Sequence, residues 1–333
     1  MTFKYSVIVP VYNRPGELRE LLQSLVDQVE RPFEVIIVED GSHETAEHVA
    51  NEFAQELNIA YVFQENAGQG FARNTGYQKA SGDYFLVFDS DCILPPNYFR
   101  ILNQRLNEQR ADAFGGPDAA HPDFTLIQQT ISHTMTAWIT TGGTRGSKRH
   151  LGVYHPRSFN MGISRQVFDE TKGYIIPFMG EDLEFSTRII KKGFKTLLIP
   201  EAFVYHKRRT DLRKFYNQLF YFGRARVNLT RFHPEELKVI HLFPLVFTLG
   251  EVFLLILSFA YPLWALVLAI PYFLFFLIIA VEGLFKTKSL GVALLSPLVS
   301  GIQLAGYGFG LLYEWIRKVR GVNPNTKYTE LYK

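Results

Sequence analysis

The chain has 333 residues, a formal net charge of +3 at pH 7 and one cysteine, Cys92. A charge this close to balance gives no indication of a nucleic-acid partner, and we expect none. A single cysteine excludes an intramolecular disulfide and is typical of a reducing compartment. The composition changes along the chain: residues 1–205 have that of a soluble α/β protein, whereas residues 240–313 are apolar enough to lie in a membrane.

Short apolar runs alternate with stretches that carry apolar residues at helical spacing. Strands that alternate with helices predict an α/β fold with a mostly parallel, doubly wound sheet. A run such as residues 85–88, apolar on both faces, fits a sheet that helices cover on both sides. The predicted strands lie at residues 5–13 (ending in a loop), 33–38, 59–63 and 85–88, and helices are predicted at residues 17–28, 44–57 and 124–140.

Polar residues follow several of these strands directly. Asp40, Asp89 and Asp91 lie at or just past strand ends, and so do residues 10–13. Because the carboxyl ends of parallel strands share one edge of the sheet, we expect these residues to converge on one crevice. Asp89 and Asp91 are one residue apart and repel each other unless a cation lies between them, which favours a divalent metal site. The alternative is an Asp-Ser-Asp turn or helix cap.

A glycine-rich loop precedes the helix predicted after residue 70. Residues 66–70, Asn-Ala-Gly-Gln-Gly, would let the backbone approach a diphosphate at the start of that helix. The alternative is that Gly68 and Gly70 only turn the chain. The loop matches neither the dinucleotide-binding fingerprint nor the phosphate-binding loop of the P-loop nucleoside triphosphatases.

Four segments occur in a characteristic order: Val-Ile-Val-Pro-Val-Tyr-Asn at residues 7–13, Val-Glu-Asp-Gly-Ser at 38–42, Asn-Ala-Gly-Gln-Gly-Phe-Ala-Arg-Asn-Thr-Gly at 66–76, and Phe-Asp-Ser-Asp at 88–91. In this order they resemble the family 2 glycosyltransferases with the GT-A nucleotide-sugar fold. The resemblance covers residues 5–206. It implies an inverting transferase that uses a nucleotide-diphospho-sugar, with a UDP-sugar as the expected donor, and Mg²⁺ or Mn²⁺.

The same resemblance assigns roles to individual residues. It places Arg73 near the sugar-diphosphate and Asn160 against the sugar. The nucleotide and metal contacts it implies are Pro10, Tyr12 and Asp40 for the nucleotide, Asp89 for ribose, diphosphate and metal, and Asp91 for the metal. Members of the family often have a histidine at the position of His206, and some of them use it as a metal ligand. A structural role for His206 is the alternative.

A predicted helix over residues 180–192 begins with several acids. Acids in a first turn ordinarily complement the helix dipole. The family pattern implies instead that the neighbouring acids Glu181 and Asp182 carry the general base. It assigns Asp182 as the base and Glu181 to substrate binding, and Glu184 is a weaker candidate for the base. One base removes the proton of the acceptor hydroxyl, so a single carboxylate with a metal site replaces the two carboxylates of a glycoside hydrolase.

The chain divides into four predicted regions. Residues 1–206 form the catalytic domain, 207–239 a basic amphipathic region, 240–316 two or three transmembrane helices, and 317–333 a polar tail. In the second region, Leu212, Phe215, Tyr216 and Leu219 have helical spacing among basic residues, which predicts a helix lying on an anionic membrane surface. The alternative is a helix packed on the catalytic domain.

The topology of the apolar part stays open. Two spans fit into residues 240–281, and Gly306-x-x-x-Gly310 in a third apolar segment predicts close helix contact. Three spans place Lys286 and Lys288 inside but the basic residues 317–320 outside, against the positive-inside rule. Two spans place residues 317–320 inside but Lys286 and Lys288 outside. We expect three hydrophobic segments; a re-entrant last segment is the alternative to one that crosses fully.

The sequence thus predicts a membrane-anchored, metal-dependent, inverting glycosyltransferase at the plasma (inner) membrane, with its catalytic domain in the cytoplasm. The membrane segments suggest a lipid-linked glycan as the acceptor. Two alternatives remain: transfer to a polyprenyl phosphate, and a catalytically inactive scaffold. Residues 218–224 lack the Gln-x-x-Arg-Trp motif of the processive synthases, which disfavours polymer synthesis.

Overall fold

The computed structural model describes residues 2–121, 123–141 and 153–322. The chain forms two compact units. The first comprises Met1–His121 and Gly146–Lys207, and the second comprises Pro122–Arg145 and Arg208–Lys333. The predicted catalytic region, 1–206, differs from the first unit mainly by the segment 122–145, which belongs to the second unit.

A seven-stranded sheet in the order β3-β2-β1-β4-β8-β6-β9 forms the centre of the first unit. The mostly parallel α/β sheet that the sequence predicts is confirmed, with β8 as an antiparallel strand between β4 and β6. The strands are β1 (Tyr5–Val11), β2 (Phe33–Asp40), β3 (Ile59–Gln64), β4 (Tyr84–Phe88), β6 (Ala113–Gly115), β8 (Asn160–Ser164) and β9 (Thr196–Leu198). Because β2 continues through Asp40, that acid closes the strand instead of following it.

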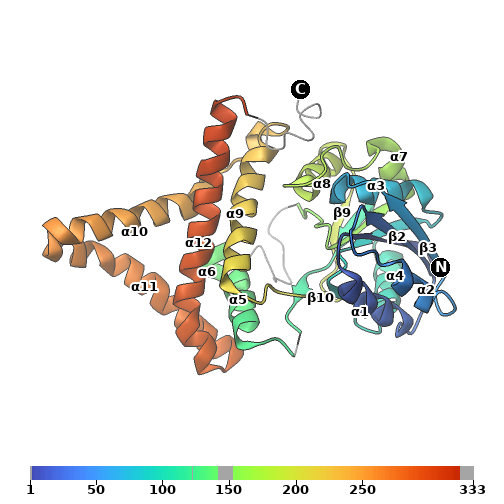
Figure 1. Cartoon of the computed structure of the whole chain (residues 1–333), viewed down its shortest axis with the longest axis horizontal. Coiled ribbons are helices and arrows are strands. Elements are labelled where there is room, and N and C mark those ends of the chain that lie inside the picture. Colours follow the sequence, from blue (N-terminus) through green and yellow to red (C-terminus); the bar gives the residue numbers. More distant parts are fainter. Residues whose placement is uncertain (1, 122, 142–152, 323–333) are drawn as a thin grey trace. The chain divides into compact units, whose positions relative to one another are not determined.

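Each central strand sends alternate side chains into two different apolar layers. In β1, Val7 and Val9 join one core cluster, whereas Ile8 between them joins the other. Helices α1 (Pro15–Val26), α2 (Glu47–Phe53) and α4 (Tyr98–Glu108) contribute to the first cluster, and α3 (Gln69–Lys79), α7 (Arg165–Thr171) and α8 (Glu181–Lys191) contribute to the second (Figure 1). The sheet is therefore covered on both faces, as its apolar strands require.

A second, small sheet fixes the position of the last strand of this unit. Strand β10 (Val204–His206) lies between β5 (Cys92–Ile93) and β7 (Asp118–Ala119). It runs antiparallel to β5, with His206 opposite Cys92. This pairing brings His206 beside the acidic segment that follows β4, although the two are far apart in the sequence.

The second unit is helical. The helix predicted at residues 124–140 is interrupted at Ala137, which has an extended conformation. The three helices α10, α11 and α12, the first taken with the turn before it, are long and apolar enough to cross a membrane. The elements are α5 (Leu126–Thr136), α6 (Trp138–Thr141), α9 (Leu212–Leu229), the short turns η1 (Pro234–Glu236) and η2 (Val239–Leu242), α10 (Phe243–Ala260), α11 (Pro262–Thr287) and α12 (Leu290–Val319).

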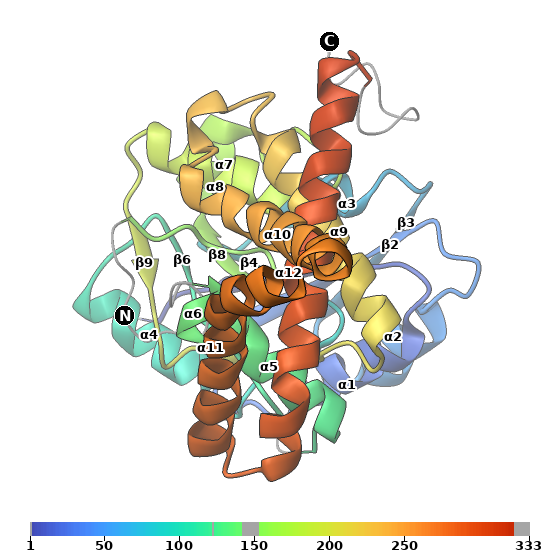
Figure 2. The same ribbon diagram turned by 90° about the vertical axis from the view of Figure 1, so that its left-hand side faces the viewer.

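Helices α9 and α12 lie side by side (Figures 1 and 2). Glycines allow the close approach: a Cβ atom on Gly223 would lie 2.0 Å from the carbonyl oxygen of Tyr307, and one on Gly310 would lie 2.0 Å from that of Phe220. The close helix contact predicted from Gly306 and Gly310 is present, and its partner is α9. The two helices run parallel, because Leu219 packs with Val299 and Arg224, farther along α9, pairs with Glu314, farther along α12.

The apolar side of α9 is covered by protein. Phe215 and Leu219 pack in one cluster with Ile131 and Met135 of α5 and Val299 of α12. The side chains predicted to face lipid thus have helical neighbours in the second unit. The assignment of this region to a membrane surface stays a prediction.

We expect the replacement Gly310→Ala to lower the stability of the second unit, because the new methyl group would overlap the backbone of Phe220. Overpacking of this kind costs about 1–3 kcal/mol. Thermal unfolding of the detergent-purified chain measures the effect, and Gly301→Ala on the same helix is the matched control, since its Cβ would meet nothing nearer than Phe276 at 3.9 Å. Equal melting temperatures for the two variants would contradict this account of the contact.

Candidate active site

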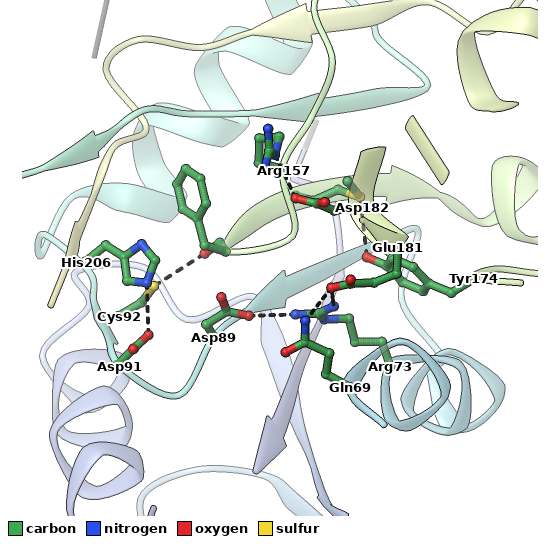
Figure 3. Close-up of polar contacts among 12 residues, drawn as sticks. Gln69, Arg73, Asp89, Asp91, Cys92, Arg157, Tyr174, Glu181, Asp182 and His206 are labelled. Atoms are coloured by element: carbon green, nitrogen blue, oxygen red, sulfur yellow. Dashed lines mark hydrogen bonds and ion pairs between the residues drawn. The ribbon is translucent and has the colours of Figure 1, made fainter. Parts of the chain in front are cut away.

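Arg73 joins two acids that lie far apart in the sequence. It comes from α3, is almost completely buried, and donates to Asp89 Oδ1 at 2.8 Å and to Glu181 Oε1 at 2.9 Å. Gln69, one turn earlier on α3, also donates to Glu181, and the Tyr174 ring lies 5.4 Å from the guanidinium carbon (Figure 3). Burial alone would lower the pKa of Arg73, but Asp89, Tyr174 and Glu181 raise it, so the side chain is a permanent cation.

A second group of side chains surrounds Asp91. His206 Nε2 lies 3.1 Å from Asp91 Oδ1, and an Arg14 guanidinium nitrogen lies 3.0 Å from Asp91 Oδ2. The His206 ring stacks on Phe159, with ring centroids 5.2 Å apart, which fixes its orientation. Sequence patterns did not single out Arg14, although it directly follows the loop predicted at the end of the first strand.

The donor atoms around Asp91 fit a divalent cation. Possible ligand atoms of Asp91, Cys92 and His206 all lie within 4.8 Å of one another. Of these three groups, the Cys92 thiol is the least suitable ligand. Burial raises its pKa well above the ordinary value, and it donates to the carbonyl oxygen of Phe159. A neutral thiol is a poor ligand, so the carboxylate and the imidazole are the better pair. That Asp91 and His206 bind a metal stays a prediction.

Asp182 is held by an arginine that the sequence did not reveal. Arg157 Nε donates to Asp182 Oδ2 at 2.6 Å, and the Asp182 side chain is largely buried (Figure 3). Asp182 begins α8 directly after Glu181, so the Arg73 and Arg157 contacts lie next to each other. The only sequence signal for Arg157 is its place shortly before Asn160.

The two neighbouring acids of α8 have opposite pKa shifts. Burial raises the pKa of Glu181, and Arg73 only partly offsets this. Burial alone would also raise the pKa of Asp182, but the charge and hydrogen bond of Arg157 lower it below its ordinary value. Asp182 is therefore ionised over a wide pH range, whereas Glu181 more readily carries a proton.

Asp40 supports the glycine-rich loop. Its carboxylate accepts hydrogen bonds from the backbone nitrogens of Ala67 at 2.8 Å and Gly68 at 2.9 Å, and from the Gln64 amide at 2.7 Å. Gly68 has φ +92°, and a Cβ on it would lie 2.7 Å from Pro177 Cβ. In the described part of the chain, the close backbone approach that glycine permits here is to residue 177 of the chain itself.

The remaining predicted residues differ in exposure. Pro10, the last residue but one of β1, is half-buried, and Tyr12 in the following loop is 47% exposed. Asn160 is buried on β8, where its amide accepts from Tyr98 and donates to the carbonyl of Ala202. Substrate contacts of Pro10, Tyr12, Asp40 and Asn160 stay predictions, and a sugar contact by Asn160 would have to share an amide that already has two internal partners.

The residues brought together thus come from four parts of the sequence. Asp89 and Asp91 follow β4, Arg73 comes from α3, Glu181 and Asp182 begin α8, and His206 ends β10. In Figure 3 the Asp89 side chain lies between the Asp91–His206 pair and the Arg73–Glu181 pair. Of the residues expected to converge from strand direction, Asp89 and Asp91 belong to this group; the convergence of Asp40 and residues 10–13 on it stays a prediction.

Comparison with known families gives one match that spans half of the chain. A sequence model of the family described as Glycosyl transferase family 2 matches residues 6–172. This stretch includes the four motifs from which the resemblance was inferred, and it ends before Glu181.

Curated relatives match a shorter stretch. Glycosyltransferase GlyA of Streptococcus pneumoniae is 39% identical over 110 residues, which are 33% of this chain and 16% of GlyA. Glycosyltransferase GlyG of the same species is 34% identical over 113 residues, which are 33% of this chain and 38% of GlyG. The chain therefore matches less than two thirds of the length of either relative.

A solved structure matches most of the chain. The mannosyltransferase PcManGT from Pyrobaculum calidifontis, in complex with GDP-Man and Mn²⁺, aligns with a TM-score of 0.60 and 15% sequence identity, over 96% of this chain and 88% of that one. At this identity the likeness shows a shared fold. The predicted GT-A architecture is confirmed at that level.

We expect His206→Ala to weaken the binding of Mn²⁺ by at least about tenfold, because changes even in the surroundings of a metal ligand have effects of that size. Titration calorimetry of the full chain measures the affinity. His121→Ala is the matched control, since the His121 ring contacts Tyr205 on the same strand as His206 but lies outside the group around Asp91. An unchanged Mn²⁺ affinity in His206→Ala would exclude this histidine as a ligand.

Proposed function

This chain belongs to glycosyl transferase family 2, and we propose on that premise that it moves a sugar from a nucleotide-diphospho-sugar to a hydroxyl group of a lipid-linked acceptor. One observation carries the proposal. Asp89, Arg73 and Glu181 form a continuous ion-paired chain that connects the acids after β4 with the acids that begin α8. A donor site and a base thereby become neighbours.

The donor end of this site combines cations and acids. Arg73 is a buried cation whose terminal nitrogens already donate to Asp89 and Glu181, so it would act on the diphosphate through its charge, and Arg14 supplies a second, half-exposed guanidinium beside Asp91. Guanidinium groups recognise phosphate oxygens by paired hydrogen bonds. PcManGT, which shares the fold, was solved with GDP-Man, and this supports a nucleotide-sugar as the donor class.

Asp91 and His206 would hold a Mg²⁺ or Mn²⁺ ion, with Asp89 as a further carboxylate nearby. Arg14 contacts Oδ2 of Asp91 and leaves Oδ1 on the side of His206. When bound, a divalent cation stabilises the negative charge that gathers on the leaving diphosphate. The Mn²⁺ in the complex of PcManGT supports this proposal.

Asp182 is the proposed general base. It accepts the proton of the acceptor hydroxyl while the hydroxyl oxygen forms a bond to the anomeric carbon. The bond from that carbon to the diphosphate oxygen breaks, and the nucleoside diphosphate leaves with the electron pair. One displacement of this kind inverts the configuration at the anomeric carbon. Glu181, held by Gln69 and Arg73, orients the donor.

The second unit supports a lipid-linked acceptor. It contains three helices that are long and apolar enough for a membrane, and an acceptor on a lipid would share that location. Nucleotide sugars are made in the cytoplasm, so we place the first unit on the cytoplasmic side of the plasma (inner) membrane. An inactive scaffold is disfavoured, because Asp89, Asp91 and Asp182 are all present and each lies beside a basic partner.

Transfer to a lipid phosphate is the second candidate, and the Arg157–Asp182 ion pair favours it specifically. Arg157 lowers the pKa of Asp182 and thus makes it a weaker base. A phosphate acceptor is already ionised and needs no strong base, and Arg157 would be a suitable cation for it. The two candidates differ in how much activity depends on Asp182.

We expect purified chain in detergent to release nucleoside diphosphate from one member of a panel of UDP-, GDP- and dTDP-sugars, with Mg²⁺ or Mn²⁺ present and not with chelator. Asp91→Asn should abolish this release through loss of the metal. Asp182→Asn should lower the rate of transfer to a hydroxyl acceptor by about 10²–10⁴-fold, the usual effect of general-base catalysis.

Glu108→Gln, on an exposed helix surface, is the matched control and should leave the rate unchanged. Loss of transfer in Asp91→Asn but not in Asp182→Asn would support the phosphate acceptor. A folded chain that neither binds nor cleaves any nucleotide sugar would exclude the transferase and leave the scaffold.

Replacing Arg157 by Gln should change the pH dependence of the reaction. With Arg157 present, the pKa of Asp182 is lowered, so the base stays ionised as the pH falls. Without this cation the pKa rises, and activity should be lost at a higher pH on the acidic side. The pH profile of kcat/KM measures this shift; Arg105→Gln, an exposed arginine between Glu108 and Glu201, should not move it. An acidic limb that stays in place would show that Asp182 is not the titrating base.

A further inference from the structure

The helices of the second unit differ in how much of their surface is apolar and exposed. Helices α10 and α11 run away from α12 and meet at a tip formed by Tyr261 and Pro262, as Figure 1 shows; in Figure 2 they lie in front of α12. In the most apolar 18-residue stretch of each helix, 11% of α10 with its preceding turn and 17% of α11 are buried within the protein, against 44% of α12. The α10–α11 hairpin is therefore the part of this unit that most needs a lipid environment.

The tip of the hairpin has the character of a membrane interface. Tyr261, Leu263 and Trp264 are 60%, 79% and 66% exposed. Aromatic side chains of this type gather where the hydrocarbon meets the head groups. Counted with the turn before it, the first arm has 22 residues and the second has 26, and a span needs about 20 residues. Both arms are long enough to cross.

Helix α12 has a narrow apolar stripe on its exposed side. Leu290, Leu294 and Leu298 are more than half exposed near its start, and Ile316 and Val319 are exposed near its end. Between these two groups, α12 is covered by Phe276 of α11 and Leu245 of α10. The opposite side of the helix packs against α5 and α9. Exposed apolar side chains near both ends of α12, with the α10–α11 hairpin packed between them and protein behind, fit a helix that lies at a membrane surface.

The position of α9 limits where α12 can lie. Helix α9 runs parallel to α12 from the close approach of Tyr216 to Gly306 to the hydrogen bond that Lys318 donates to Thr230, so it follows the second half of α12 to its end. The outer side of α9 is polar, with Arg213, Lys214 and Asn217 exposed. If α12 crossed the membrane, this polar side would lie within the hydrocarbon, where charged side chains are strongly disfavoured; the pairing of Lys214 with Asp211 only adds an acid there.

Charged residues at the two ends of α12 have the same sign. Lys286 and Lys288 precede the helix, and Arg317, Lys318 and Arg320 end it. A crossing helix would place one of these groups on the outer side, which is the conflict with the positive-inside rule found in the sequence. A helix that lies along the surface leaves both groups on one side, and the uncharged tip at Tyr261 then lies on the other.

We propose that α12 lies along the membrane surface, with its exposed leucine stripe at the boundary of the lipid hydrocarbon, and that only the α10–α11 hairpin crosses the bilayer. Helix α9 then lies above α12, at the level of the head groups, with its basic side chains outward. This assignment does not rest on the proposed function, since it uses only the packing and charges of the second unit.

Cysteine labelling from the two sides of the membrane tests this topology. The native Cys92 is fully buried, so the wild-type chain is the unlabelled background. Lys288→Cys, Val322→Cys and Leu263→Cys are introduced singly into the full chain, and sealed vesicles of both orientations are treated with a maleimide that does not cross membranes. We expect Lys288→Cys and Val322→Cys to be labelled from the same side and Leu263→Cys from the other, each with at least a tenfold preference.

Two outcomes would overturn the proposal. Labelling of Lys288→Cys and Val322→Cys from opposite sides would show that α12 crosses. Labelling of Leu263→Cys from the same side as the other two would show that the hairpin does not. Only variants that elute from gel filtration like the wild type are scored, and Val239→Cys, exposed just before α10, is the control that must follow Lys288→Cys.

Spin labels test the depth of α12 independently. The chain is reconstituted in vesicles of phosphatidylethanolamine and phosphatidylglycerol with labels at Leu294, Leu298 or Ile316, and at Leu249, exposed at the middle of the first arm, as the deep reference. We expect similar, shallow depths for the three α12 labels from their accessibility to oxygen and to a nickel chelate. A maximum of depth at the middle of α12 would overturn the proposal. So would labels that reach neither reagent and broaden each other, which would indicate a second copy of the chain on the stripe.

Discussion

The buried Arg73 guanidinium holds Asp89 and Glu181 on either side of it, and the rest of the acidic site depends on this arrangement. Two carboxylates so close to further acids would repel one another without a fixed cation. Arg73 can stay charged in the interior because both partners are within hydrogen-bond distance. It thereby connects the acids after β4, which we propose as the donor end, with α8, which carries the proposed base. A second arginine, Arg157, does the same for Asp182 at the acceptor end.

Much of the first unit could be predicted because the relevant signals are local. Apolar runs such as residues 85–88 fix the central strands, and parallel strands bring their carboxyl ends to one edge. Asp40, Asp89 and Asp91 were placed at that edge from strand direction alone. The role of Asp182 was different: residues at the start of a helix are acidic for many reasons, so only the resemblance to a family distinguished it from Glu184.

Other features could not be predicted, because they depend on contacts between distant segments. Nothing around Arg14 or Arg157 indicates an acidic partner, and Cys92 meets His206 only through the small second sheet. The amphipathic pattern of α9 shows that one side is buried but not what buries it. The pattern was interpreted as a lipid contact, whereas the structure places α5 and α12 there. Similarly, the sequence places residues 122–145 in the catalytic domain, because nothing local shows that they pack with the second unit.

The central claim is that Asp89 joins a metal site to the diphosphate site at Arg73, and the binding of nucleoside diphosphates tests it most directly. Calorimetric titration of the wild-type chain and of Asp89→Asn, each with and without Mn²⁺, is the measurement. The account predicts that Mn²⁺ strengthens the binding of one nucleoside diphosphate at least about tenfold in the wild type, the scale of effect seen when metal sites are perturbed, and that Asp89→Asn loses this gain. Equal affinities in all four titrations would contradict it.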